Sequence, residues 1–250
     1  MISIYFYSFA SVLIVSLVSL IGVFTLSLKE AVLRKYVFLL VSLAVGALLG
    51  DAFIHLIPEA FEEFSNPTHL SVAVIVGIIL FFVLEKFLHW HHHNIDDSEK
   101  QKIHPIGRMV LVSDGVHNFI DGLIIGVSYL ISIEVGIATT IAVILHEIPQ
   151  EIGDFGILIH SGYSTSRALW LNFVSALSAV AGTATAFIIG GASETLALWL
   201  VPLAAGGFIY IAMSDLIPEM HKAKLPKDSV MQLLAVVIGV VAMLGLLAIE

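Results

Sequence analysis

Long apolar stretches with few polar positions dominate the chain. Eight of them are about 20 residues long, at 5–28, 36–60, 70–88, 107–130, 134–158, 167–191, 195–220 and 229–249. A bilayer core takes about 20 apolar residues per helix, whereas barrel strands would be shorter and would alternate. The pattern therefore predicts an all-α polytopic membrane protein with eight transmembrane helices, forming a single domain over residues 1–250.

Composition strengthens this prediction. The chain of 250 residues is 58% hydrophobic and only 12% charged, with a mean hydropathy of +1.01. This is more apolar surface than a soluble globule of the same size could bury. The formal net charge of −9 argues against a nucleic-acid partner and fits cations better. There is no cysteine, so disulfides and thiolate metal ligands are excluded.

The basic residues indicate how the helices are oriented. All 11 lysines and arginines fall in or beside the connections that follow runs one, three, five and seven. They are Lys29, Arg34, Lys35, Lys86, Lys100, Lys102, Arg108, Arg167, Lys222, Lys224 and Lys227. Because cytoplasmic loops carry the excess of Lys and Arg, we expect these connections in the cytoplasm and both termini outside. The expected location is the cell membrane, with the lipid bilayer as a partner.

Two short segments resemble each other across the chain. The run His55-Leu56-Ile57-Pro58-Glu59 matches Asp215-Leu216-Ile217-Pro218-Glu219 at four of five positions. The first would travel outward and the second inward, and inverted repeats of this kind build many secondary transporters. We therefore predict that helices 1–3 and 6–8 form an inverted repeat around helices 4–5. The alternative is that the two proline-containing segments are similar only because each one kinks its helix.

Ionisable groups accompany this repeat. Asp51, His55 and Glu59 share one face of the second run at four-residue spacing, and such groups inside a span usually face a cavity or a partner. Glu59 would mark an outer mouth of a pathway and Glu219 an inner one, with Asp215 beside it. For His55 alone we favour a satisfied interhelical hydrogen bond.

The fourth and fifth runs each carry a row of polar side chains near mid-span. The first row is Asp114, His117, Asn118 and Asp121, and the second is His146, Glu147, Gln150, Glu151 and Asp154. At about 100° per residue each row falls on one face of a helix, and antiparallel helices bring the rows to the same depth. Neutral imidazole and carboxylate suit Zn²⁺ and also Fe²⁺ or Mn²⁺. Asp114 and Asp154 lie one turn toward the cytoplasm and would extend the site into an exit path.

Two other functions are compatible with these rows. Facing carboxylates repel unless a cation or protons intervene, so a proton pathway is one alternative. His146-Glu147 also resembles the start of the His-Glu-x-x-His motif, which makes an intramembrane zinc-dependent hydrolase the second. Position 150 is Gln rather than His and Pro149 interrupts the turn, so we expect a transporter and not an enzyme.

The one long connection, at about 89–106, is rich in histidine and is expected in the cytoplasm. Its clustered histidines are His89, His91, His92 and His93, and acidic residues follow them. Imidazoles at this density capture a divalent cation loosely, without a fixed cage. A solvated loop whose histidines do little is the equal alternative.

Together these features resemble the ZIP (Zrt/Irt-like) family of divalent metal transporters. The resemblance rests on eight spans, external termini, the histidine-rich loop between spans three and four, His-Asn-x-x-Asp-Gly from His117 and His-Glu-x-Pro-x-Glu from His146. It covers essentially the whole chain. It implies uptake of Zn²⁺, and often of Fe²⁺, Mn²⁺ or Cd²⁺, into the cytoplasm.

The resemblance also implies which residues bind metal. The transport site would use His117, Asp121, His146, Glu147 and Gln150. A neighbouring second metal position would use Asn118, Asp121, Glu147 and Glu151, with Asp121 and Glu147 as shared bridging carboxylates. Many members have a histidine where this chain has Gln150, and an amide oxygen is a weaker, harder ligand, which leaves the preferred metal open. Divalent metal ions are the expected partners, as substrates, and a homodimer is an open alternative to a monomer.

Overall fold

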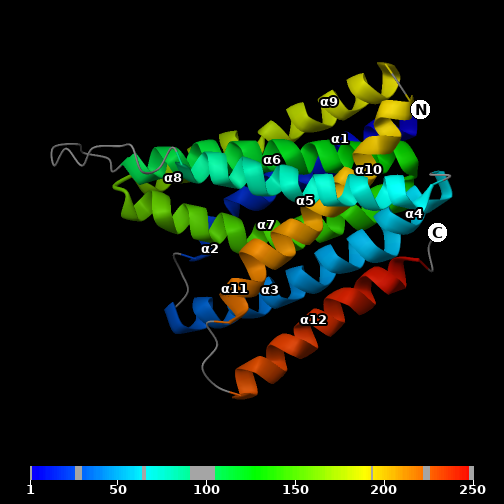
Figure 1. Cartoon of the computed structure of the whole chain (residues 1–250). Coiled ribbons are helices and arrows are strands. Elements are labelled where there is room, and N and C mark those ends of the chain that lie inside the picture. The colour runs from blue at the N-terminus through cyan, green and yellow to red at the C-terminus, as the bar shows by residue number, and fades with distance from the viewer. Residues whose placement is uncertain are drawn as a thin grey trace.

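The structure is a computed structural model that describes residues 2–25, 30–63, 66–90, 105–192, 194–221 and 226–247. Within these ranges the chain is helical and contains no strand (Figure 1). Taken in chain order, the helices form eight segments of membrane-spanning length. The prediction of an all-α polytopic membrane protein is confirmed.

Four of the eight segments are single helices and four are interrupted. The single helices are α5 (Pro67–Trp90), α6 (Pro105–Ile131), α7 (Ile133–His160) and α12 (Pro226–Leu246). The first interrupted segment consists of α1 (Ile2–Val18), η1 (Ser19–Ile21) and α2 (Gly22–Thr25), and the second of α3 (Glu30–Gly50), η2 (Asp51–Leu56) and α4 (Ile57–Glu63). The sixth consists of α8 (Thr165–Ala176) and α9 (Ser178–Ala192). The seventh consists of α10 (Glu194–Ile211), η4 (Ala212–Leu216) and α11 (Ile217–Met220). Because α5 ends at Trp90 and α6 begins at Pro105, the expected loop at 89–106 is helical at both of its ends.

Helix α7 differs from the other segments in its apolar character. Seven segments among the described residues are long and apolar enough to cross a bilayer, and the polar row of α7 keeps it out of that group. With 28 residues it is nevertheless longer than the roughly 20 that a bilayer core requires. It packs against α6, α3 and α1. These neighbours shield its polar row from lipid.

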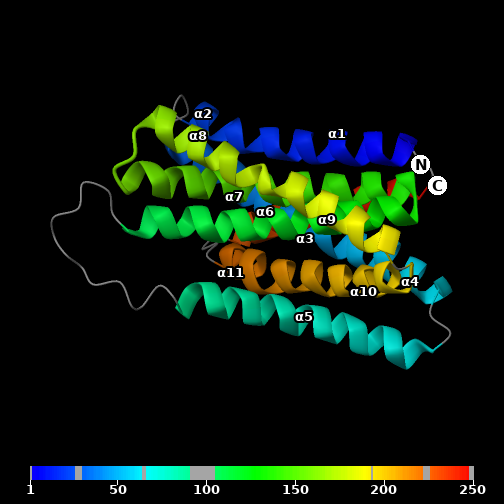
Figure 2. The same ribbon diagram turned by 90° about the horizontal axis from the view of Figure 1, so that it is seen from above.

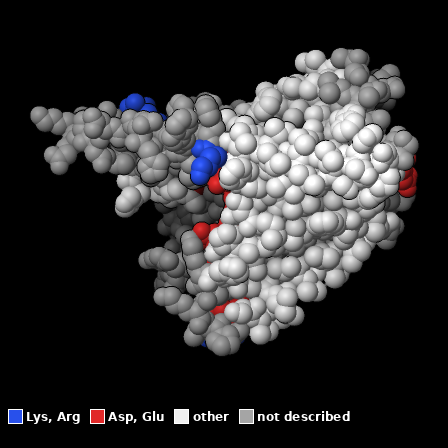
Figure 3. Space-filling model, in the orientation of Figure 1, with Lys and Arg blue, Asp and Glu red and all other residues white. Residues whose placement is uncertain are grey.

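The two ends of the helix bundle differ in charge. The described chain begins and finishes at one end (Figures 1 and 2), as eight crossings require. Lys86, Arg108, Arg167 and Lys227 lie near the helix ends opposite to the chain termini. On the face drawn in Figure 3, the visible basic residues lie at that end, and a broad face along the helices is without charged residues. We call this the basic end of the bundle.

The two Leu-Ile-Pro-Glu segments adopt the same local structure. A π-helical turn precedes Ile57-Pro58 in η2 and Ile217-Pro218 in η4. A π turn inserts an extra residue into the helix, and such turns are frequent at functional sites. The helices that lead into them, α3 and α10, run in opposite senses (Figure 1). The shared turn supports the inverted-repeat interpretation, which stays a prediction.

Close helix contacts also recur between the two halves. A Cβ atom on Gly46 of α3 would meet the carbonyl oxygen of Val236 in α12. In the same way, a Cβ atom on Gly206 of α10 would meet the carbonyl oxygen of Val74 in α5. Small residues let helices approach closely inside membranes. The second segment is therefore paired tightly with the eighth, and the seventh with the third.

Helix α9 is tied to α6 in a similar way. Gly122 of α6 leaves room for the carbonyl of Ala179 in α9. The Ser178 hydroxyl donates to the Gly115 carbonyl at 2.6 Å, and the Thr183 hydroxyl donates to the Gly122 carbonyl at 2.7 Å. These bonds join α6 to a helix that follows α7 in the chain. They fix α6 while its polar row faces α7.

Candidate metal site

Two antiparallel helices position the polar rows. The single residue Ser132 joins α6 to α7, and its side chain caps α7 by accepting the Val135 backbone N–H at 3.1 Å. So short a link places the helices side by side as a hairpin. His117 stands 15 residues before Ser132 and His146 stands 14 residues after it, so both rows reach the same depth.

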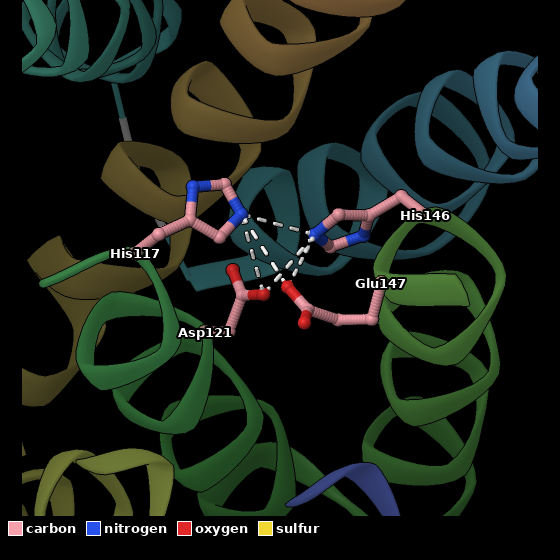
Figure 4. A group of neighbouring side chains, drawn as sticks. All are labelled: His117, Asp121, His146 and Glu147. Atoms are coloured by element: carbon pink, nitrogen blue, oxygen red, sulfur yellow. Dashed lines mark hydrogen bonds and ion pairs between the residues drawn. The ribbon is translucent and has the colours of Figure 1, made fainter. Parts of the chain in front are cut away.

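Four of the predicted side chains converge between α6 and α7 (Figure 4). His146 Nε2 lies 3.1 Å from Asp121 Oδ2, 3.5 Å from Glu147 Oε1 and 3.3 Å from His117 Nε2. His117 Nε2 lies 3.6 Å from each of the same two carboxylate oxygens. All four potential ligand atoms fit within 4.8 Å of one another. We call these four residues the histidine group.

The surroundings of the histidine group suit a cation. His146 Nδ1 lies 3.3 Å from the Ala142 carbonyl oxygen, which only accepts, so this nitrogen carries the N–H. In the neutral ring the Nε2 lone pair then faces Asp121 and Glu147. Neither carboxylate has a hydrogen-bond partner, and both are at most 1% exposed. Lone pairs and buried carboxylates repel one another until a positive charge lies between them.

A second group contains carboxylates only. Asp114, Glu147 and Glu151 each place an oxygen within 4.8 Å of the others. We call these three residues the carboxylate group. Glu147 belongs to both groups. We expected Asp121 in the second group as well, but it lies in the histidine group only, and Asp114 stands in the second group instead. Asn118 donates its amide to Asp114 Oδ1 at 2.8 Å, so it lies beside the carboxylate group, and its role as a metal ligand stays a prediction.

A cavity of about 310 Å³ reaches the site from the basic end of the bundle. It brings together five of the predicted residues, namely Asp114, His117, Gln150, Asp154 and Asp215. Figure 3 shows carboxylate atoms in a hollow at this end. Glu219 is exposed on α11 and is absent from the described lining of this cavity, where Asp215 stands instead.

Sequence reasoning missed the wall of this cavity that α5 and α10 form. Glu85 and Tyr210 line it, and Glu85 accepts hydrogen bonds from the Tyr210 hydroxyl and from Ser214, the latter at 3.4 Å. A glutamate beside Lys86 at the end of an apolar run has the pattern of a surface residue. Only the packing of α5 against α10 brings Glu85 to the cavity.

Two of the residues predicted for the outer pathway are buried. Asp51 is fully buried, and its Oδ2 accepts a hydrogen bond from Thr139 of α7 at 2.9 Å. The His55 ring donates from Nε2 to the Met243 carbonyl of α12 at 3.1 Å, which is the interhelical hydrogen bond that we favoured. Glu59 is half-buried on α4. A role for these three in transport stays a prediction.

The histidine-rich loop falls largely outside the described residues. His91, His92 and His93 lie beyond the described end of α5. His89 belongs to the last turn of α5, so its backbone is helical. Loose metal capture by these histidines stays a prediction.

Known proteins resemble this chain over most of its length. A family model described as "ZIP Zinc transporter" matches residues 2–108 and 91–247. Zinc transporter ZIP13 of Pongo abelii is 35% identical over 219 residues, covering 82% of this chain and 65% of that protein. Zinc transporter SLC39A7 of Mus musculus is 33% identical, with coverage of 86% and 63%, and the metal cation symporter ZIP14 of Xenopus tropicalis is 31% identical, with coverage of 86% and 62%.

These matches settle the family. The chain spans a little under two thirds of the length of these three relatives. Their names describe transporters and not enzymes, in agreement with the expectation from the sequence. The family model covers both polar rows and both Leu-Ile-Pro-Glu segments. This chain therefore belongs to the ZIP zinc transporter family.

Proposed function

We propose that this chain carries divalent transition-metal cations across a membrane, with Zn²⁺ as its first substrate. The observation that carries the proposal is the histidine group between α6 and α7, in which Asp121, His146 and Glu147 are buried and His117 is half-buried. Ionisable groups inside a span are rare and usually mark an ion pathway. Relatives named as zinc transporters and as a metal cation symporter support the same proposal.

The spacing of the histidine group suits a small transition-metal ion. Tetrahedral Zn²⁺ with bonds of about 2.0–2.1 Å places its ligand atoms about 3.3–3.4 Å apart. The five separations that involve a histidine nitrogen run from 3.1 to 3.6 Å. Small side-chain adjustments are therefore enough for binding. Fe²⁺, Mn²⁺ and Cd²⁺ stay candidate substrates because imidazole and carboxylate bind several such ions.

The two ends of the bundle offer different access to this site. The cavity reaches His117 from the basic end, where Asp114, Asp154 and Asp215 provide a negative lining that attracts cations. Toward the other end, Asp51 and His55 are buried in contacts with α7 and α12. Because basic loops are cytoplasmic, we infer that the cavity opens to the cytoplasm and that uptake runs inward.

A carrier cycle follows from this arrangement. The ion enters at the outer mouth near Glu59, binds at the histidine group and leaves past Asp114 and Asp154 when one group of helices moves against the other. Asp215 lines the cavity, which supports an exit beside Asp215 rather than beside Glu219. Protons compete with the metal, because imidazole and carboxylate bind it only when deprotonated.

Metal uptake into proteoliposomes tests the proposal. His146→Ala and Asp121→Ala should each lower uptake of radioactive zinc by about 100-fold or more, because even loss of a group that only supports a ligand costs about 10–100-fold. His69→Ala is the matched control, since His69 is exposed on α5 and should keep full uptake.

Three results would count against the proposal. Undiminished uptake in both site variants would remove the histidine group from the pathway. No uptake of any divalent cation by the unaltered chain would refute metal transport. A proton flux driven by a pH gradient in the absence of metal would favour the proton pathway instead.

Gln150 provides a test of metal preference. It lines the cavity beside His117, where an imidazole would add a softer nitrogen ligand. Gln150→His should raise the ratio of Zn²⁺ to Mn²⁺ uptake when the two ions compete. An unchanged ratio would show that another residue sets the preference.

A further inference from the structure

Hydrogen bonds join the described helices into two sets. In the first set, the His55 ring of η2 donates to the Met243 carbonyl of α12. The Tyr210 hydroxyl of α10 donates to Glu85 of α5, and α10 also packs against η2, which connects the two pairs. We call α3, α5, α10 and α12, with the short helices that continue them, the α3 set.

The second set is built around α6 and α7. Helix α9 is tied to α6 by the two hydroxyl bonds described above. In α8, the Asn172 amide donates to the Glu151 carboxylate of α7. The Ala176 carbonyl of α8 accepts from the Ser16 hydroxyl of α1 at 2.9 Å. We call α1, α6, α7, α8 and α9 the α6 set. In Figure 2, α1 and α8 lie on one side of the bundle, and α5 and α10 lie on the other.

A buried hydrogen bond connects the two sets. The Thr139 hydroxyl of α7 donates to Asp51 Oδ2 of η2 at 2.9 Å, and both residues are fully buried. In helices, threonine hydroxyls commonly donate to the carbonyl one turn earlier, as the neighbouring Thr140 does to Gly136 at 2.6 Å. A threonine has one hydroxyl proton, so Thr139 uses it across the boundary between the sets.

This bond lies on the side of the histidine group that is away from the cavity. Thr139 precedes His146 by seven residues, which is about 10 Å along the helix. The cavity residue Asp154 follows His146 on the same helix. Asp51 begins the π turn η2, and His55 holds the same turn on α12. The bond therefore stands between the histidine group and the end of the bundle that holds the chain termini.

The burial of the two partners makes this contact favour two states. In a dry interior, a hydrogen bond to a carboxylate is stronger than in water, and a carboxylate that loses its donor there is unfavourable. If α7 moves away from η2 far enough to admit water, the carboxylate is hydrated instead. A small separation without water is the least favourable arrangement. The contact is therefore stable when closed and dry or when open and hydrated.

We propose that the Thr139–Asp51 hydrogen bond is a latch that closes the outer end of the pathway and that opens before an ion reaches the histidine group from that end. The latch joins a helix that carries metal-site residues to a helix of the other set. Its opening is therefore required before the two sets can separate at this end. The proposal rests on the function proposed above, because a latch regulates transport only if ions pass between the sets.

Thiol labelling of the metal-free chain tests the latch without any transport. Val143→Cys places a thiol in a fully buried position, one turn beyond Thr139 toward His146. Adding Thr139→Val should raise the rate of reaction with a polar maleimide by about 10-fold or more, because the closed state then holds a carboxylate that has lost this donor. Thr139→Ser keeps the hydroxyl and should leave the rate near that of the Val143→Cys chain.

Two controls separate opening of the latch from general loosening. Thr140→Val removes a hydroxyl that binds within its own helix, and it should leave the labelling at position 143 unchanged. Ala168→Cys reports on a fully buried position within the α6 set, in a cluster with Phe155, and it should stay slow when Thr139→Val is added. An unchanged rate at position 143, or an equal rise at both thiols, would overturn the proposal.

Zinc uptake into proteoliposomes gives a second readout. An ion from outside binds only to the open state, so its apparent affinity is reduced by the fraction of chains in that state. Thr139→Val should therefore lower the apparent KM for external zinc by up to about 10-fold, which damage to the structure would not do. Thr139→Ser should keep the KM of the unaltered chain. An unchanged or higher KM in Thr139→Val would count against the latch.

The latch and the proposed function fail in different ways. If the labelling changes as expected but the unaltered chain takes up no divalent cation, the transport proposal falls and the latch stands as a contact that closes the bundle. If uptake depends on His146 and Asp121 but Thr139→Val leaves the labelling at position 143 unchanged, the latch alone is overturned.

Discussion

The two π-helical segments η2 and η4 share a sequence pattern and a backbone, but their surroundings differ. In η2, Asp51 is fully buried and His55 is 3% exposed. In η4, Asp215 occupies the position equivalent to His55, and it is exposed on the cavity. The same local structure is therefore packed in one half of the chain and open in the other.

In the predicted inverted repeat, this difference would give access to the site from one end of the bundle only. An inverted repeat whose halves have different surroundings has a natural second state, in which the surroundings are exchanged. Exchange would close the cavity around Asp215 and open a path beside His55. We expect the predicted repeat to act in this way, and each prediction below tests one part of the comparison.

Thiol labelling gives the largest expected difference. The chain has no cysteine, so His55→Cys and Asp215→Cys each introduce a single thiol. In metal-free protein, the thiol at 215 should react with a polar maleimide about 100-fold faster than the thiol at 55. The reason is that the buried position must first open locally, at a cost of about 2.7 kcal/mol. Similar rates at the two positions would contradict the comparison.

The hydrogen bond between Thr139 and Asp51 should have the next largest effect. Thr139→Val removes the donor to a buried carboxylate and should lower the free energy of unfolding by about 1.5–3 kcal/mol. The residue equivalent to Asp51 in the second half is Ile211, which is 2% exposed. Adding Asp51→Ile should therefore recover much of the lost free energy of unfolding, because both polar partners are then gone. Thermal unfolding of the detergent-solubilised variants measures both steps, and a further loss in the double variant would refute the pairing.

The paired glycines should behave alike in the two halves. Gly46→Ala and Gly206→Ala each place a Cβ atom against a backbone carbonyl of the partner helix. Each should lower the free energy of unfolding by about 1–3 kcal/mol, the usual effect of overpacking. Thermal unfolding measures both. A loss confined to one of them would show that the two helix pairs are not equivalent.

Gly153 offers the smallest effect and serves as a contrast. It lies next to Asp154 on α7, and a Cβ atom there would meet nothing within 4 Å. Gly153→Ala should raise the free energy of unfolding by up to about 1 kcal/mol, because alanine favours the helix and no neighbour must move. Destabilisation in the same thermal unfolding assay would mean that another element packs against this part of α7.

The sequence predicted most of the fold because each membrane-spanning helix corresponds to a long apolar run of residues. It did not predict the interruptions at η1, η2 and η4. Pro58 and Pro218 were the available signals for the two π turns, since each stands two residues after the end of its turn. The ends of α5 and α6 were also missed, because polar residues in a helix resemble those of a loop.

The histidine group was predictable for a different reason. His117 and Asp121 lie four residues apart and share a helix face, and His146 and Glu147 are sequence neighbours about 100° apart on the next helix, so regular spacing placed them together. Asn172 was not predictable, because it is a lone polar residue on another helix and reaches Glu151 only through the tertiary fold. The separate carboxylate group likewise depends on how α6 and α7 are rotated against each other.

The single-residue link at Ser132 governs how the polar rows enter a membrane during synthesis. A carboxylate at the centre of a lone inserting helix is unfavourable by about 2.5–3.5 kcal/mol, and α6 and α7 each carry more than one. Because the link is so short, the two helices are expected to insert together as a hairpin. Each helix then shields the carboxylates of the other from lipid. The link thus protects the chain before α9 and α10 have been made.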